Sequence, residues 1–335
     1  MSPAERSGSA ARPPDSAGPP ASEELHRHTQ LPLWRRVLPV AIAAALVATV
    51  LVRIDWPSFW NELLALNYPA FVAFFIVFLV ALLAADTLAT LYVYRRSLGR
   101  VRFGQLLIMR GASYLPSALN HHLGQAWLTY FVAQVFGVRL GRVAGATLLV
   151  YATWGGCVLG LGSAGMLAAG LPVGWLTAPL GAGVAYLVLL ATKPRRLADN
   201  RVLGPLMEAG VTGHLLAMAW RLPHVAVLFL GTWLPFYFFG IAIPIADALT
   251  YLPIIMVAIT LPITPQGFGT RDVLAATFFA SHVAGAETPE QCLAVVAAAT
   301  MTQGVVITLV SLSIGVVLMP RALRLRRSGL TVARS

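Results

Sequence analysis

The 335-residue chain has few charged residues and few cysteines. Only 11% of its residues are Asp, Glu, Lys or Arg, and 58% are apolar. A soluble chain has about 25% charged and about 45–50% apolar residues, so this one lacks the polar surface that would cover it in water. Cys157 and Cys292 both fall within apolar runs, which argues against a disulfide framework or a zinc cluster. The composition predicts a polytopic membrane protein.

The sequence also lacks the motifs of several common enzyme classes. It has no Gly-rich phosphate loop with a lysine, no DxD or HxxxxD pattern and no GxSxG elbow. We therefore predict no catalytic residue, no cofactor and no metal site. The net charge of +11 does not indicate a nucleic-acid partner, because the arginines form short clusters between apolar runs, as on the cytoplasmic side of membrane proteins.

The apolar runs predict an all-α polytopic membrane protein with about six full spans. These spans are 37–52, 69–94, 143–165, 174–192, 222–243 and 290–319. Placing every arginine cluster inside is consistent with a cell-membrane protein that has both termini in the cytoplasm. The predicted transmembrane domain covers 37–320, between a disordered cytoplasmic tail at 1–30 and a basic cytoplasmic tail at 321–335.

Two regions, 103–137 and 248–284, each begin and end on the same predicted side of the membrane. The predicted helix breaks are Pro116 and Gly124 in the first region and Pro262 and Pro265 in the second. Non-helical backbone at membrane depth is tolerated only where protein or a watery cavity surrounds it. We therefore predict two re-entrant helical hairpins that enter from opposite faces. If the hairpins cross fully, the spans number eight to ten.

The order span, hairpin, span occurs twice, over about 69–165 and about 222–318. This pattern predicts an inverted repeat whose broken helices meet near the middle of the membrane, as in many transporters. The polar segment between the halves, about 197–221, is predicted to lie as an amphipathic helix on the cytoplasmic surface.

The stretch 267–272, Gly-Phe-Gly-Thr-Arg-Asp, is the most informative candidate site. Thr270 is predicted to cap a following helix, whose free N–H groups and positive dipole end attract anions. Arg271 offers five donors suited to a phosphate or carboxylate, and Asp272 either orients Arg271 or favours the helix start. The alternative is that Arg271 and Asp272 form a purely structural ion pair.

The first hairpin supplies neutral polar groups from Asn120, His121, His122 and Gln125. These side chains either contact a ligand or pack against the second hairpin. Adjacent histidines point to different faces of a helix, and no further ligand cluster is present, so we predict no metal there.

An acid, Asp86, lies deep within the run 69–94. A carboxylate at this depth is costly and usually paired. Its predicted partner is Arg110 or Arg271, and a structural salt bridge is favoured over proton coupling.

The residues Leu261-Pro262 and Gly267-Phe268-Gly269-Thr270-Arg271-Asp272 resemble the P…GGxGxRE signature of the lysylphosphatidylglycerol synthase transmembrane region, also described as flippase-like integral membrane proteins. In the first half, Asn120 and Gly124 resemble the family's asparagine and glycine. His121-His122 replaces the usual Pro-Gly turn, Gln125 replaces a glutamate, and Leu128 or Thr129 replaces an arginine. The resemblance covers about 37–320.

This resemblance implies a transmembrane module that moves or presents a phospholipid or a lipid-linked sugar. In the synthase, amino-acid transfer belongs to a separate soluble domain. We find no such domain in this sequence and therefore do not expect transfer of lysine.

The leading hypothesis is a flippase-like protein whose partner is an anionic phospholipid or a lipid-linked sugar, held in a groove between the hairpins. The predicted headgroup-binding residues are Gly267, Gly269, Thr270, Arg271, Asp272, Asn120, His121 and Gln125. One alternative is an accessory subunit of a lipid- or glycolipid-modifying enzyme. The other is a membrane-embedded transferase with Asp272 or His121 as the base.

Overall fold

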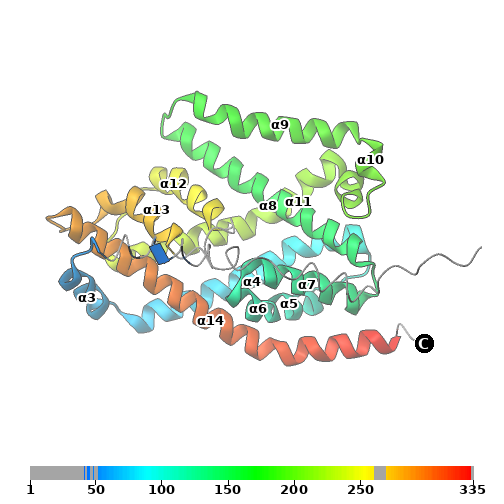
Figure 1. Cartoon of the computed structure of the whole chain (residues 1–335), viewed down its shortest axis with the longest axis horizontal. Helices are drawn as coiled ribbons and strands as arrows, with labels where there is room; N and C mark the ends of the chain where they lie inside the picture. The colour runs from blue at the N-terminus through cyan, green and yellow to red at the C-terminus, as the bar shows by residue number, and fades with distance from the viewer. Residues whose placement is uncertain (1–40, 42–43, 46–47, 49–51, 260–268, 333–335) are drawn as a thin grey trace, which may run out of the picture.

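Most of the chain is helical in the computed structural model, which describes residues 41, 44–45, 48, 52–259 and 269–332 (Figure 1). Most of the first predicted span, 37–52, lies outside the described residues. So do Pro262, Pro265 and Gly267 of the second predicted hairpin.

The described helices follow one another along the chain with short connections. They are α3 (Trp56–Ala65), α4 (Tyr68–Leu98), α5 (Phe103–Ala112), α6 (Tyr114–Leu119), α7 (His121–Phe136), α8 (Leu140–Ala168), α9 (Thr177–Thr192), α10 (Arg195–Ala198), α11 (Gly204–Trp233), α12 (Ile245–Ala258), α13 (Thr270–Phe279) and α14 (Pro289–Val332), with 3₁₀ turns at Val173–Leu176, Leu234–Phe239 and Ala280–His282. Within the described ranges, extended pairing is limited to one isolated bridge between Ile241 and Val283.

Four of the described helices are long and apolar enough to cross a membrane. They are α4, α8, α11 with its 3₁₀ extension to Phe239, and α14 as far as Arg327. The predicted all-α polytopic membrane fold is confirmed. The predicted span 174–192 is shorter in the structure: α9 has 16 residues, or about 24 Å at 1.5 Å per residue, against about 30 Å of hydrocarbon.

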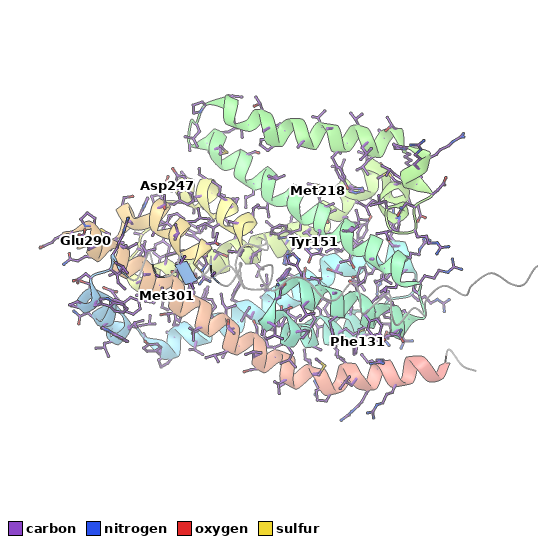
Figure 2. All side chains as sticks on the ribbon, viewed as in Figure 1. Phe131, Tyr151, Met218, Asp247, Glu290 and Met301 are labelled. Atoms are coloured by element: carbon purple, nitrogen blue, oxygen red, sulfur yellow. The ribbon has the colours of Figure 1, made fainter. Side chains whose placement is uncertain are left out.

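Charged residues gather at opposite ends of the helix bundle. At one end, Arg142 joins α4 to α11: its Nε donates to the Ser97 carbonyl at 2.7 Å, and its Nη2 lies 3.2 Å from Glu208 Oε2. At the other end, His282 Nε2 lies 2.8 Å from Asp247 Oδ2. Asp247 and Glu290 both lie at this acidic end (Figure 2). The basic and acidic loops that the sequence separated are therefore also apart in space.

Two apolar cores occupy the two halves of the bundle's length. The first surrounds Phe71, Phe75 and Phe279, and the second surrounds Leu106 and Met109. Helices α4, α11 and α14 contribute to both cores. Asp86 lies on α4 between the stretches that enter the two cores. Together with its partners Arg110 and Arg221 it forms a polar layer between them.

The first hairpin region folds as two helical legs, α5–α6 and α7, but its break is displaced from the predicted positions. The break is Asn120, whose backbone is extended and whose Oδ1 accepts the His122 N–H at 2.8 Å. Pro116 lies inside α6, where the first turn needs no N–H donor. Gly124 lies inside α7, and a Cβ there would collide with the Ser117 side chain. Pro116 and Gly124 therefore shape the legs, and the prediction that they break the helix is wrong.

Each hairpin region packs against the closing helix of the other half. Helices α5, α6 and α7 contact α14, and α12 contacts α8. Glycine permits the close approach in both places: Gly111 of α5 faces Leu318 of α14, and Gly165 of α8 faces the Leu249 carbonyl of α12. Because each hairpin region packs on a helix of the other half, these contacts hold the two halves together around the polar layer.

Residues 204–221 differ from the predicted surface helix over 197–221. They form the first part of α11, which runs past residue 221 to Trp233, so the predicted boundary between residues 221 and 222 is wrong. The backbone departs from helical geometry at Gly210 (φ 58°, ψ −172°). Two of the polar residues that suggested a water-facing segment, His214 and Arg221, are buried and paired, whereas Glu208 is exposed. His214 Nε2 lies 2.9 Å from Tyr186 Oη, and Arg221 reaches Asp86.

Outside the spans, Asp55 stabilises the start of α3, and we expect this contribution to depend on pH. Hydrogen bonds from the Ser58 side chain and from its amide N–H, the latter 2.9 Å from Oδ2, lower the pKa of Asp55 below its ordinary value of 3.8. A lowered pKa gives stability that is present above the unfolded value and is lost as pH falls through the folded one.

After correction for intrinsic exchange, hydrogen exchange of the Ser58 amide should therefore accelerate as the pH falls below the ordinary Asp pKa of 3.8 and through the lowered pKa of Asp55. The Ala70 amide, which Asn67 caps at 3.2 Å, is the matched control, because Asn67 does not titrate. The same pH step in an Asp55→Ala variant would contradict the assignment.

Candidate functional site

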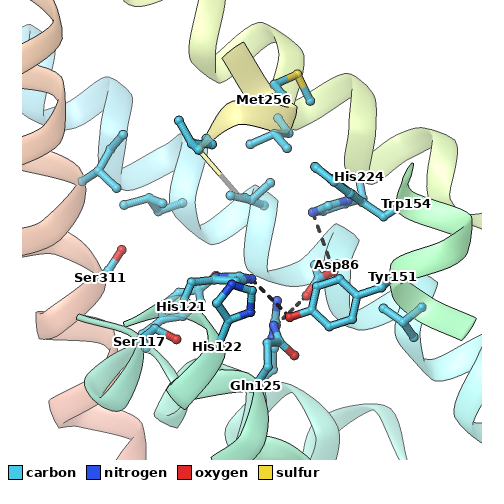
Figure 3. A pocket seen from close by; sticks show the side chains of 18 of the residues that line it. Asp86, Ser117, His121, His122, Gln125, Tyr151, Trp154, His224, Met256 and Ser311 are labelled. Atoms are coloured by element: carbon cyan, nitrogen blue, oxygen red, sulfur yellow. Dashed lines mark hydrogen bonds and ion pairs between the residues drawn. The ribbon is translucent and has the colours of Figure 1, made fainter. Parts of the chain in front are cut away.

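A cavity of about 300 Å³ lies in the polar layer between the two cores (Figure 3). Its lining includes Leu79, Leu82, Asp86, Arg110, Tyr114, Ser117, Asn120, His121, His122, Gln125, Tyr151, Trp154, Arg221, His224, Leu228, Met256, Ile259, Ile307, Thr308 and Ser311. Asp86 precedes Arg95 by nine residues, which is about 14 Å of helix. Half of the hydrocarbon is about 15 Å thick, so the cavity lies close to mid-membrane depth.

Asp86 is the centre of a buried charge cluster. Its Oδ2 contacts Arg110 Nε, and its Oδ1 lies 3.0 Å from Arg221 Nη1 and 3.7 Å from His224 Nε2. Arg221 Nη2 also donates to Thr90 Oγ1 at 3.3 Å. The predicted pairing of Asp86 with Arg110 is present, but the second guanidinium beside Asp86 is Arg221 and not Arg271.

The cluster carries more positive than negative charge. One carboxylate faces two guanidinium groups, and Arg is always protonated in proteins. The Arg221 side chain is only 2% exposed, whereas that of Arg110 retains 15%. Because buried charge is costly unless it is paired, the cavity favours an anion beside Arg110.

The walls of the cavity differ in chemical character. The first hairpin and α8 supply hydrogen-bonding side chains, and His121 Nε2 lies 3.5 Å from Tyr151 Oη. Figure 3 shows His121, His122 and Gln125 rising from α7 toward Tyr151 and Asp86. Leu79, Leu228 and Met256, from α4, α11 and α12, supply apolar surface. A molecule with a polar end and an apolar end can satisfy both walls.

Local structure places the polar residues of α7. Because Asn120 closes the first turn through its side chain, His121 and Gln125 follow at the start of a regular helix. Residues four apart share a helix face, so His121 and Gln125 both reach the cavity. The structure thus brings Asn120, His121 and Gln125 together with Asp86 and Arg110, which the sequence analysis singled out separately.

The residues of the second signature that the structure describes form a separate cluster. Gly269, with φ 79°, precedes α13, and its N–H donates to Asp272 Oδ2 at 2.9 Å. The residue at the cap position is therefore Gly269, and the prediction for Thr270 is wrong. Arg271 Nη2 donates to the Thr300 carbonyl at 2.6 Å and lies 3.5 Å from Asp272 Oδ1. These contacts tie α13 to α14. Gly269, Thr270, Arg271 and Asp272 are not among the described residues that line the cavity.

Arg221 and His224 line the cavity, although neither was predicted as a site residue. Arg221 was expected on the membrane surface, because the polar residues around it suggested a helix in water. The signal that pointed to the site was the spacing of three residues between Arg221 and His224, which puts both on one face of a long apolar helix.

The histidines of the cavity are not joined by enough other metal-ligating side chains, among the described residues, to form a metal site. Within the described ranges, no group of three or more His, Cys, Asp and Glu residues is close enough to hold a metal ion. His121 and His122 are followed by Gln125 on the same helix, and His224 faces the Asp86 carboxylate.

Comparison with known proteins identifies one related family. Residues 36–311 match the family described as the lysylphosphatidylglycerol synthase TM region. No curated protein and no solved structure matches the chain. Every residue that lines the cavity falls within the matched range.

Proposed function

Because the chain belongs to the lysylphosphatidylglycerol synthase transmembrane-region family, we propose that it binds a phospholipid or a lipid-linked sugar and carries its headgroup across the membrane. Its family relates it to lipid modification or translocation, and its long apolar helices make it a multi-pass membrane protein. In this proposal the phosphate sits beside Arg110 in the cavity at mid-membrane depth.

One observation carries the proposal: two guanidinium groups share a single carboxylate in a buried cavity. A phosphodiester supplies the one negative charge that balances the cluster. Arg110 lies at the cavity face and has planar donors suited to phosphate oxygens. Arg271 has a structural role in this proposal, because it donates to a backbone carbonyl of α14.

The two walls of the cavity explain how a headgroup could pass without any covalent step. Moving a polar group into hydrocarbon is costly because its hydrogen bonds with water are lost. Asn120, His121 and Gln125 offer replacement partners, while the apolar wall accepts the first carbons of the lipid tails. The protein then lowers the barrier to passage and needs no catalytic residue.

We also propose that the protein lies in the cell membrane with both termini on the cytoplasmic side. The support is that α10, with Arg195 and Arg196, and the arginine-rich end of α14 lie at one end of the bundle (Figure 1), with Asp247 and Glu290 at the other (Figure 2). Cytoplasmic loops of membrane proteins carry an excess of Lys and Arg.

The test is lipid movement between leaflets in liposomes that contain the purified protein. We expect Arg110→Gln to slow movement of an acyl-labelled anionic phospholipid by about tenfold to a hundredfold. Hydrogen bonds to charged groups contribute about 1.5–3 kcal/mol, and each 1.4 kcal/mol is a factor of ten. Arg110→Lys, which keeps the charge but not the planar donors, should move lipid at a rate between those of the wild type and Arg110→Gln.

Arg142→Gln is the matched control, because it removes an arginine from an exposed pair outside the cavity. It should move lipid at the wild-type rate. Thermal unfolding of each variant in detergent separates loss of transport from loss of fold. Equal rates for a folded Arg110→Gln variant and the wild type would contradict the proposed site. A wild-type rate no higher than that of protein-free liposomes would contradict the proposed function.

A further inference from the structure

The polar wall of the cavity consists of neutral hydrogen-bonding groups. Gln125 supplies an amide, His121 an imidazole and Tyr151 a hydroxyl, and the His121 and Tyr151 polar atoms are 3.5 Å apart. Asn120 Oδ1 accepts the His122 N–H at 2.8 Å, so this oxygen already has a partner. Such groups donate to and accept from hydroxyls, as they do with water.

Negative charge in the described cavity comes from Asp86 alone, and Asp86 is already engaged. Both of its oxygens contact guanidinium groups, and His224 lies 3.7 Å from one of them. The stretch 260–268, which follows the lining residue Ile259 in the sequence, contains no charged residue. The described lining therefore offers no carboxylate that could pair with an ammonium group on a ligand.

From this arrangement we infer the substrate class of the proposed translocation: a phosphodiester lipid whose headgroup beyond the phosphate is uncharged and hydroxylated, either glycerol or a sugar. The inference rests on the proposed function. The phosphate balances the surplus charge at Arg110, and the hydroxyls bond to His121, Gln125 and Tyr151. The volume of about 300 Å³ is at the small end of ligand pockets, which suits a single small headgroup.

Lipids whose headgroup ends in an ammonium group are disfavoured by the same cluster. In such a lipid the phosphate beside Arg110 would bring the ammonium close to a site that already holds two guanidinium groups. Like charges at a few ångströms repel strongly where water is excluded, and an unpaired cation at membrane depth is costly. Selection among lipid headgroups thus depends on the balance of charge in the cavity and on hydrogen bonds from its neutral polar wall.

The first arm of the experiment compares headgroups on the wild-type protein. Liposomes contain full-length protein and a trace of lipid with a fluorophore on a shortened acyl chain, so that the headgroup stays intact. The lipids are phosphatidylglycerol, phosphatidylglucose, phosphatidylethanolamine and phosphatidylcholine, and an impermeant reductant bleaches the outer leaflet. We expect phosphatidylglycerol or phosphatidylglucose to move at least about tenfold faster than the two amine lipids, which corresponds to about 1.4 kcal/mol. The faster of these two identifies glycerol or sugar as the preferred group.

The second arm adds a carboxylate to the cavity with Gln125→Glu. This substitution should raise the rate for phosphatidylethanolamine relative to phosphatidylglycerol by about tenfold. Gln134→Glu is the matched control, because it adds the same charge to α7 at a position outside the described lining. It should leave the headgroup ratio unchanged.

The outcomes separate this inference from the proposed function. If the wild type moves all four lipids at the same rate, or moves amine lipids faster, the substrate class is wrong while translocation stands. A headgroup ratio that Gln125→Glu and Gln134→Glu shift equally would also overturn the inference, because the selection would then not come from the cavity. If no lipid moves faster than in protein-free liposomes, the proposed function itself fails.

Discussion

Replacing Asp86 with asparagine is expected to destabilise the protein by about 3–5 kcal/mol, which is the usual cost of removing one partner from a buried ion pair. Asp86 is 4% exposed and holds Arg110 and Arg221 together. Without the carboxylate, two guanidinium groups face each other at membrane depth with no counter-charge. The effect should appear as a lower unfolding temperature in detergent.

The control for this prediction is Asp247→Asn at the acidic end. Its pair with His282 leaves the Asp247 side chain 35% exposed, and exposed pairs contribute about 0–1 kcal/mol. Arg221→Met combined with Asp86→Asn should recover part of the loss, because one unpaired cation is then removed. An Asp86→Asn variant no less stable than Asp247→Asn would show that the cluster does not hold α4 to α5 and α11.

Replacing Gly165 with alanine is expected to destabilise the packing of α8 on α12 by about 1–3 kcal/mol, the usual cost of overpacking. A Cβ at this position would meet the Leu249 carbonyl and the Thr250 amide nitrogen. Both are backbone atoms of a helix, so neither can move aside by a change of rotamer. Thermal unfolding in detergent measures the loss.

Gly160→Ala on the same helix is the matched control. No atom lies within 4 Å of a Cβ built there, and alanine has a better helix propensity than glycine by about 1 kcal/mol. This variant should therefore match or slightly exceed the wild type in stability. If the two variants are equally stable, the close contact between α8 and α12 is not present in the folded protein.

The sequence located the spans well where apolar runs are continuous. The predicted run 69–94 lies within α4, which begins after the Asn67 cap and ends at Leu98, before the capping residue Gly99. The prediction for 204–221 was wrong, because hydropathy averages the residues along a segment. It cannot recognise that Arg221 pairs with Asp86 and His214 with Tyr186 inside the bundle. A buried ion pair adds two polar residues to two helices and leaves no sign of the pairing in either.

The candidate site was predicted in part. Asn120, His121 and Gln125 stood out because they interrupt an apolar region, and Asp86 because an acid at membrane depth needs a partner. The pairing of Asp86 with Arg221 in the same cavity could not be predicted, because these two residues are separated by 135 positions in the sequence. The signature around Arg271 drew attention as a ligand site, yet its described contacts are with Thr300 and Asp272, which join two helices.

The amino-acid sequence by itself determined the class of protein, the family, the separation of basic from acidic loops and the presence of a buried acid. These properties depend on composition, on period and on local pattern, which any segment carries with it. Tertiary structure alone decided which guanidinium groups surround Asp86, where the first hairpin turns and which wall of the cavity is polar. Those depend on how helices from distant parts of the chain cross, and the crossing is set by side-chain packing that no single segment contains.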